Sequence, residues 1–152
     1  YMATEKHEFV TVRLGDQLLG IPVLDVQDVL NAQSITPVPL APDWVAGVLN
    51  LRGRIVTAID LRARLGLPQR DDDAGRYRMS VVVEQNEAPY SLLIDEIGEV
   101  LSLDDKRFEK NPVTFGAIWK EVAKGVYRLD EELMVVLDVD RVLSFEAVDV
   151  AA

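Results

Sequence analysis

The chain has 152 residues, and its 16 Lys and Arg against 26 Asp and Glu give a formal net charge of −10. Hydrophobic residues (49%) and charged residues (28%) occur in globular proportions, which excludes an intrinsically disordered chain. The absence of cysteine excludes disulfides, thiolate catalysis and cysteine-ligated metal centres. No apolar run approaches the ~20 residues of a membrane span, and no basic-then-apolar start resembles a signal peptide. We therefore expect a soluble, cytoplasmic protein without direct membrane insertion.

The first part of the chain predicts a β-hairpin. Residues 9–14 alternate and are rich in β-branched side chains, and a turn at Gly15-Asp16-Gln17 leads into a second apolar run at 18–23. Residues 26–30 fit either a further strand or a helical turn. The prolines that follow hold the chain extended, because each lacks an amide donor and restricts the residue before it. These residues are Pro37, Pro39 and Pro42.

A second hairpin is predicted at residues 47–59, with its turn at Arg52-Gly53-Arg54. A single helical turn at 61–65 follows, ended by a glycine and a proline. Residues 69–76 are polar and predict a linker. They contain Asp71-Asp72-Asp73, which we interpret as solvated charge rather than as a site for a hard cation.

The pattern recurs after the linker. A shift of 71 positions aligns residues 10–30 with 81–101, and a shift of 78 aligns 47–67 with 125–145. The second block keeps several identities, among them Gly47 with Gly125 and Asp60 with Asp138. Two matching blocks in the same order indicate a tandem duplication, with the extra residues of the second half around 106–124.

The duplication predicts an all-β fold. We place the first repeat at 8–68 and the second at 77–146, each with about five short strands. A sheet this small exposes its edge strands unless it closes, so two small packed barrels are the natural solution.

Catalytic and cofactor chemistry has little support in the sequence. His7 is the only histidine, and we interpret it as a solvated residue of the N-terminal tail. A Gly-x-Ser-x-Gly elbow, a phosphate loop and a dinucleotide fingerprint are all absent. Asp60 and Asp138 are expected to cap the helical turns that follow them. The sequence predicts a protein that is not an enzyme and needs no metal or cofactor.

The two repeats differ most at a hairpin tip. Asn50-Leu51-Arg52-Gly53-Arg54 in the first repeat becomes Arg128-Leu129-Asp130-Glu131-Glu132 in the second, so the tip changes from basic to acidic. The equivalent turn is expected to form without Arg52, which leaves this arginine available for a role in binding, although surface drift is an alternative.

The residues around this tip resemble those of a known family. Asn50-Leu51-Arg52-Gly53, followed by Ile55-Val56 and Ile59-Asp60-Leu61-Arg62, is similar to the central signature of the CheW family of chemotaxis coupling proteins. The resemblance extends over residues 8–146, which we take as one CheW-like domain. One departure is Asp28, which stands where the family commonly has Glu.

The resemblance implies a fold and a function. It implies two five-stranded, SH3-like or OB-like barrels around a shared hydrophobic interior, with segments that can be exchanged between barrels. It also implies a non-enzymatic adaptor that couples the cytoplasmic tips of transmembrane chemoreceptors to the regulatory domain of the histidine kinase CheA. The location implied is the cytoplasm, with recruitment to membrane-associated chemoreceptor arrays.

Two other functions are considered. An OB-like barrel that binds single-stranded nucleic acid or an oligosaccharide would need a basic groove with exposed aromatic residues. Only 7% of the residues are aromatic and the net charge is −10, so no nucleic-acid partner is expected. A domain cut from a kinase or from a receiver-linked coupling protein is the other alternative. A start at Met2, close to the first strand, and the end at Ala152 favour a complete single-module protein.

Five residues are predicted to bind partners. In the family a receptor hairpin lies against an apolar groove between the barrels, and Val26, its repeat equivalent Ile97, and Ile94 are our candidates for this groove. We predict an ion pair between Asp28 and Arg52 that holds the guanidinium beside a partner surface. Their equivalents, Glu99 and Asp130, are both acidic, so the second repeat cannot form the same pair.

Overall fold

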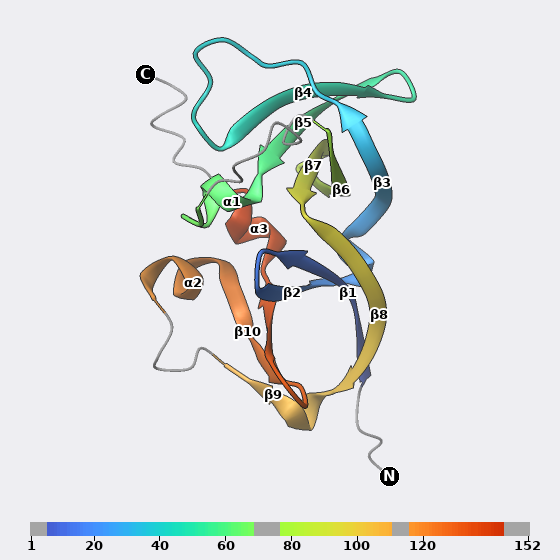
Figure 1. The fold of residues 1–152 in the computed structure, drawn as a ribbon. Coiled ribbons are helices and arrows are strands. Elements are labelled where there is room, and N and C mark those ends of the chain that lie inside the picture. The colour runs from blue at the N-terminus through green and yellow to red at the C-terminus, as the bar shows by residue number, and fades with distance from the viewer. Residues whose placement is uncertain (1–5, 69–76, 111–115, 145–152) are drawn as a thin grey trace.

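The computed structural model describes residues 6–68, 77–110 and 116–144 (Figure 1). The predicted linker at 69–76, with its three aspartates, lies outside the described residues. The described part of the chain is mostly β and forms two sheets. One has six strands in the order β8-β1-β2-β11-β10-β9, and the other has five in the order β3-β6-β7-β5-β4. They are called the first and the second sheet below.

The strands follow the predicted hairpins closely, and residues 26–30, which the sequence left open, belong to a strand. The first-sheet strands are β1 (Lys6–Leu14), β2 (Gln17–Pro22), β8 (Glu96–Asp104), β9 (Phe108–Glu109), β10 (Ala123–Arg128) and β11 (Leu133–Leu137). The second-sheet strands are β3 (Val26–Ser34), β4 (Val45–Leu51), β5 (Arg54–Asp60), β6 (Tyr77–Gln85) and β7 (Ala88–Ile94).

Each sheet takes strands from both repeats. The strands of each repeat can be numbered 1 to 5 in chain order, which are β1 to β5 in the first repeat and β6, β7, β8, β10 and β11 in the second. With these numbers both sheets have the strand order 3-1-2-5-4, and β9 is added at the end of the first sheet. In each sheet, strands 1 and 2 come from one repeat and strands 3, 4 and 5 from the other. The repeats 8–68 and 77–146 therefore do not form separate sheets.

The connections between strands explain this exchange. Only Asp95 separates β7 from β8, and the one-turn helix η1 (Val23–Asp25) separates β2 from β3. Strand β8 runs antiparallel to β1, its neighbour. If β8 instead paired with β6 of its own repeat in the same antiparallel way, it would run parallel to β7. The chain would then have to return from the end of β7 to its beginning, a distance of about 23 Å at the usual rise of a strand. A single residue cannot cover this distance, so β8 continues into the other sheet.

Two short helices begin at the repeated aspartates. The side chain of Asp60 accepts hydrogen bonds from the backbone N–H groups of Arg62 (3.0 Å) and Ala63 (3.3 Å) at the start of α1 (Leu61–Arg64). Asp138 accepts one from the N–H of Arg141 (3.3 Å) at the start of α3 (Val139–Val142). The predicted capping roles are confirmed. Two further helices are α2 (Ala117–Val122) and η3 (Asp105–Arg107).

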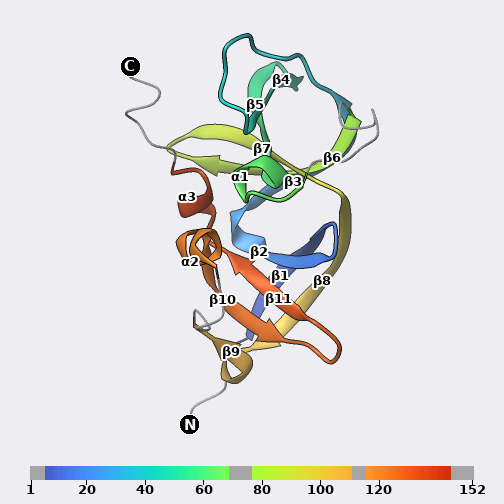
Figure 2. The ribbon, with the colours of Figure 1, turned by 60° about the vertical axis from the view of Figure 1, so that its left-hand side comes forward.

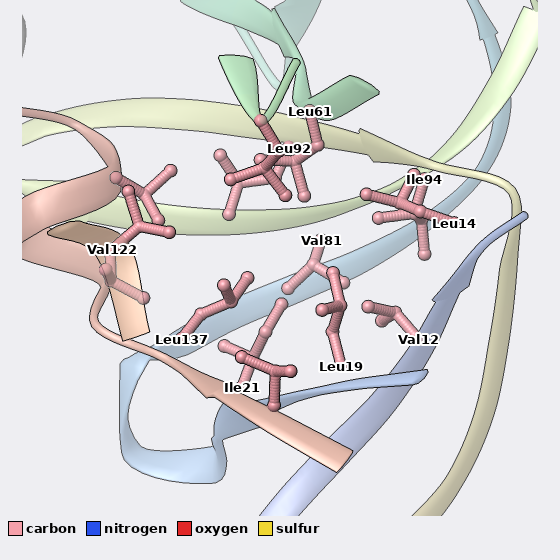
Figure 3. Close-up of a cluster of buried hydrophobic side chains, with 14 of the residues drawn as sticks. Val12, Leu14, Leu19, Ile21, Leu61, Val81, Leu92, Ile94, Val122 and Leu137 are labelled. Carbon is pink, nitrogen blue, oxygen red and sulfur yellow. The ribbon is translucent and has the colours of Figure 1, made fainter. Parts of the chain in front are cut away.

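Three groups of buried apolar side chains hold the fold together. One lies within each sheet, around Phe9 and Tyr127 in the first and around Leu30 and Leu93 in the second. The largest lies between the sheets and takes side chains from both, as well as from α1, α2 and α3 (Figure 3). This shared core joins the two sheets, which lie at opposite ends of the molecule with α1 and α3 between them (Figures 1 and 2).

Candidate functional site

Arg52 lies at the tip of the β4–β5 hairpin in an unusual backbone conformation. The two residues of the turn, Arg52 and Gly53, have φ angles of 53° and 84°. Positive φ at both positions is typical of the type I′ turn that matches the twist of a hairpin, where Asn or Gly usually occupies the first position. The side-chain oxygen of Asn50 accepts a hydrogen bond from the N–H of Gly53 (3.0 Å). An arginine in this conformation costs free energy, which makes it a candidate for function.

The guanidinium of Arg52 reaches from this tip to β3. Its Nη1 lies 2.8 Å from Oδ2 of Asp28, so the predicted ion pair is present. The Asp28 side chain is 25% exposed and that of Arg52 is 75% exposed. The other carboxylate oxygen of Asp28 accepts a hydrogen bond from the N–H of Val29 (2.8 Å), which fixes its orientation. The pair therefore holds an accessible guanidinium whose remaining donors can meet a carboxylate of another molecule.

Apolar side chains lie along β3, the strand that carries Asp28, and along β8, its equivalent in the other sheet. Strands β3 and β8 are each the edge of their sheet. Val26 and Ile97, which were predicted to form the stripe, are half-buried and pack against the shared core. Val29 and Val100 occupy equivalent positions in the two repeats and are more accessible, with 41% and 56% of their surface exposed.

Val29 and Val100 were not predicted, although the spacing of 71 that links Val26 to Ile97 links them as well. Val29 pairs with Val81 in β6, and Val100 pairs with Val10 in β1. Both of these neighbours belong to the shared core. Val29 and Val100 therefore lie at the margin of that core, and the four residues Val26, Val29, Ile97 and Val100 are called the margin stripe below.

Ile94 does not belong to this surface. Its side chain is fully buried in the shared core, with 0% of its surface exposed. The prediction that Ile94 contributes to an accessible groove is therefore wrong. Ile94 ends the uninterrupted apolar run Leu92-Leu93-Ile94, in which Leu93 faces the second-sheet core and its two neighbours face the shared core. Such a run is typical of a strand buried on both faces.

A further surface, which no sequence pattern predicted, surrounds Leu24. This leucine of η1 is 95% exposed. It lines a cleft of about 630 Å³ together with the aromatic residues Phe9, Phe108 and Tyr127. The Tyr127 ring lies 5.5 Å from Phe9 and 5.3 Å from Phe108 between centroids. Burial, with the nearby charge of Asp105 as a smaller cause, raises the pKa of the Tyr127 phenol.

No group of three or more histidine and acidic side chains in the described ranges could hold a metal ion. His7 forms a hydrogen bond with the carboxylate of Asp105 at the surface rather than standing alone in a tail. Within the same ranges, no helix is both long and apolar enough to cross a membrane.

These observations define a class: a mostly β protein of two equivalent sheets, with an ion-paired hairpin tip and an apolar stripe exposed on its surface. The chain belongs to the family described as the CheW-like domain, whose model matches residues 8–147.

Several known proteins are similar to most of the chain. The chemotaxis protein CheW of Treponema pallidum is 28% identical over 142 residues, covering 92% of this chain and 84% of that protein. CheW of Klebsiella aerogenes is 29% identical over 143 residues, covering 94% and 85%. The crystal structure of the scaffolding protein TtCheW from Thermoanaerobacter tengcongensis superimposes with a TM-score of 0.82 at 25% identity, covering 93% of this chain and 95% of that one.

Proposed function

We propose that this protein is a non-enzymatic adaptor of bacterial chemotaxis, which couples the cytoplasmic tips of chemoreceptors to the regulatory domain of the histidine kinase CheA. The observation that carries the proposal is the family match over residues 8–147, which includes all of the two-sheet unit except the first two residues of β1. Similarity to chemotaxis proteins and to a scaffolding protein over most of the chain supports it. The protein would act in the cytoplasm and be recruited to membrane-associated receptor arrays.

The margin stripe is the proposed receptor surface. It presents two accessible valines, Val29 and Val100, next to two half-buried residues, Val26 and Ile97. An apolar stripe between two edge strands suits a helical hairpin that docks through its own apolar residues. Arg52 is held at β3 by its ion pair with Asp28, the residue before Val29, and would bind a carboxylate of the docked partner.

An adaptor needs a second surface for its second partner. We assign the cleft around Leu24 to the kinase regulatory domain, because an almost fully exposed leucine beside an aromatic-lined cleft fits the apolar centre of a protein interface. The residues that line this cleft do not include Arg52 or any member of the margin stripe.

Parallel pull-down experiments test the proposal. The wild-type protein should retain both a receptor cytoplasmic fragment and the kinase regulatory domain, and the two should bind together. Val100→Lys should lose the receptor fragment and keep the kinase domain, and Leu24→Lys should do the reverse. Failure of the wild-type protein to retain either partner would contradict the proposal. Binding of a single-stranded oligonucleotide or an oligosaccharide instead would support the OB-like alternative.

A further inference from the structure

Two ion pairs tie the ends of the central hairpins to the strands beside them. In the first sheet, Arg13 at the end of β1 binds Glu132, which leads into β11, through two hydrogen bonds of 3.1 Å and 2.7 Å. In the second sheet, Nη2 of Arg54 at the start of β5 lies 3.9 Å from Oε2 of Glu84 near the end of β6.

These two pairs occupy equivalent places with their charges reversed. The repeat shift of 71 takes Arg13 to Glu84, and the shift of 78 takes Arg54 to Glu132. Each pair thus joins the same strand position to the same hairpin position, but the first sheet has the cation on the strand and the second sheet has it on the hairpin.

The backbone alone does not decide which hairpin joins which sheet. Strand β11 lies parallel to β2 with Val136 opposite Gly20, and β5 lies parallel to β7 with Ala58 opposite Ser91, which is the equivalent register. Strand β4 follows β3 after residues 35–44, and β10 follows β9 after residues 110–122, so each hairpin is joined to the strand before it by a connection of ten or more residues. The interchanged arrangement would therefore have the same strand order.

We propose that Arg13, Glu84, Arg54 and Glu132 sort the two hairpins between the two sheets. In the observed arrangement both contacts join opposite charges. If the hairpins changed places, Arg13 would face Arg54 and Glu84 would face Glu132, so that both contacts would join like charges. Repulsion against a competing arrangement gives specificity even where each pair adds little stability.

The packing beside these pairs favours the same assignment. A side chain at Gly20 would lie within 2.7 Å of the end of Met134 in β11, and Met134 is fully buried. The equivalents in the second sheet are Ser91 and the smaller Val56. With the hairpins interchanged, Ser91 would face Met134 in the place that Gly20 leaves open, whereas Gly20 would leave space beside Val56.

The Asp28–Arg52 pair does not contribute to this sorting. After interchange Arg52 would face the acidic Glu99, and Asp28 would face the acidic Asp130. One favourable contact is therefore kept in either arrangement, and the sorting depends on the other four residues.

Charge reversal gives a direct test. The double variant Arg13→Glu/Glu132→Arg keeps opposite charges in both observed pairs, but it also gives opposite charges in the interchanged arrangement. Reversing Arg54→Glu and Glu84→Arg as well restores repulsion in the interchanged arrangement and again keeps both observed pairs. The quadruple variant is thus the matched control for the double variant.

Cysteine pairs report the arrangement, because the natural chain contains no cysteine. Gln17→Cys with Leu133→Cys reports the observed contact, since the Gln17 side chain reaches the carbonyl of Leu133 (3.4 Å). Gln17→Cys with Ile55→Cys reports interchange, because Ile55 is the repeat equivalent of Leu133. Each pair is introduced into the wild-type, double-variant and quadruple-variant charge backgrounds. The full chain is then refolded from denaturant under oxidising conditions at low salt.

We expect the interchange disulfide to rise by about tenfold in the double variant over the wild-type charges and to fall back in the quadruple variant. Salt at about 1 M, which shortens the screening length to about 3 Å, should remove the difference between the two. Equal yields of this disulfide in the double and quadruple variants at low salt would overturn the proposal. If either variant fails to refold, the single variants Glu132→Arg and Glu132→Gln are compared instead, each with the Gln17→Cys/Leu133→Cys pair. The proposal requires a lower yield of this disulfide in Glu132→Arg than in Glu132→Gln, and equal yields would overturn it.

Discussion

Arg62 of α1 and Asp95, the single residue between β7 and β8, form a mostly buried ion pair. Nη2 of Arg62 lies 2.5 Å from Oδ2 of Asp95, and the two side chains are 12% and 16% exposed. The same carboxylate accepts a hydrogen bond from the N–H of Gly15 in the β1–β2 turn (2.7 Å). Arg62 also donates to the carbonyl of Pro68 (2.6 Å). The point where the chain crosses between sheets is therefore fastened to α1 and to the first hairpin.

We expect Asp95→Ala to lower the free energy of unfolding by about 2–4 kcal/mol, because it leaves a largely buried guanidinium without its carboxylate. Arg62→Ala should have a similar effect, and the double variant should cost less than the sum of the two. Chemical denaturation of the four proteins measures this coupling. Additive losses would mean that the two side chains act independently.

Replacing Arg52 should separate stability from binding. Arg52→Asn places a residue that tolerates positive φ at the first turn position and should raise the free energy of unfolding by about 0.5–1 kcal/mol, despite the loss of an exposed ion pair. The same variant should bind the proposed partners more weakly. Denaturation midpoints and titration with the receptor fragment and the kinase domain give the two quantities. A less stable variant would mean that the ion pair outweighs the turn strain.

The geometry of the Arg52 side chain should matter as well as its charge. Arg52→Ala should weaken partner binding while the protein stays folded, and Arg52→Lys should restore binding only in part, because an ammonium cannot form the two-pronged contact of a guanidinium. The charge swap Asp28→Arg with Arg52→Asp tests the pair itself. Arg128→Ala is a suitable control, since Arg128 is an exposed arginine paired with Glu109 at 2.5 Å in the other hairpin. Wild-type binding by Arg52→Ala would remove this residue from the site.

The margin stripe can be tested at its most accessible member. Val100→Lys should abolish receptor binding and change the melting temperature by only a few degrees, because the valine is 56% exposed. Val26→Lys should be more destabilising, since Val26 packs against the shared core. Leu40→Lys, at a fully exposed leucine in the β3–β4 connection, should leave binding unchanged. Retained binding in Val100→Lys would exclude the stripe.

The Arg13–Glu132 pair should make stability depend on pH in the acidic range. The hydrogen bond from Arg13 lowers the pKa of the Glu132 carboxyl below its usual value near 4.5. The unfolded chain therefore binds this proton at higher pH than the folded protein does. The stabilisation is fully present above pH 4.5 and is lost as the pH falls through the folded-state pKa. The stability difference between wild type and Glu132→Gln should shrink between pH 6 and pH 3, and a difference that does not vary with pH would contradict the role of this pair.

Local features of the protein could be predicted from its sequence because they depend on neighbouring residues. Alternation and turn residues predicted the hairpins, and the repeat spacing predicted the capping aspartates. The comparison of repeats predicted the Asp28–Arg52 pair. These two residues have opposite charges, whereas their equivalents Glu99 and Asp130 are both acidic, so the pair is a feature of the first repeat alone. These residues lie in the same sheet, so the exchange of strands did not affect the prediction.

Burial depended on contacts that periodicity does not encode. The alternation of a strand separates its two faces but does not say whether a second layer covers the outer face. Ile94 was expected at the surface and is buried because the first sheet packs over it. Leu24 lies between the apolar runs predicted at 18–23 and 26–30, so no pattern described it, and it is exposed in η1.

The sequence by itself determined the family, the strands and the duplicated order of the elements, since each is written in local patterns and spacings. Only the tertiary structure decided that each sheet combines strands of both repeats. The single residue between β7 and β8 is too short to return along β7, so the chain must cross to the other sheet. That crossing builds the shared core and places β3 and β8, with the margin stripe, at its edge.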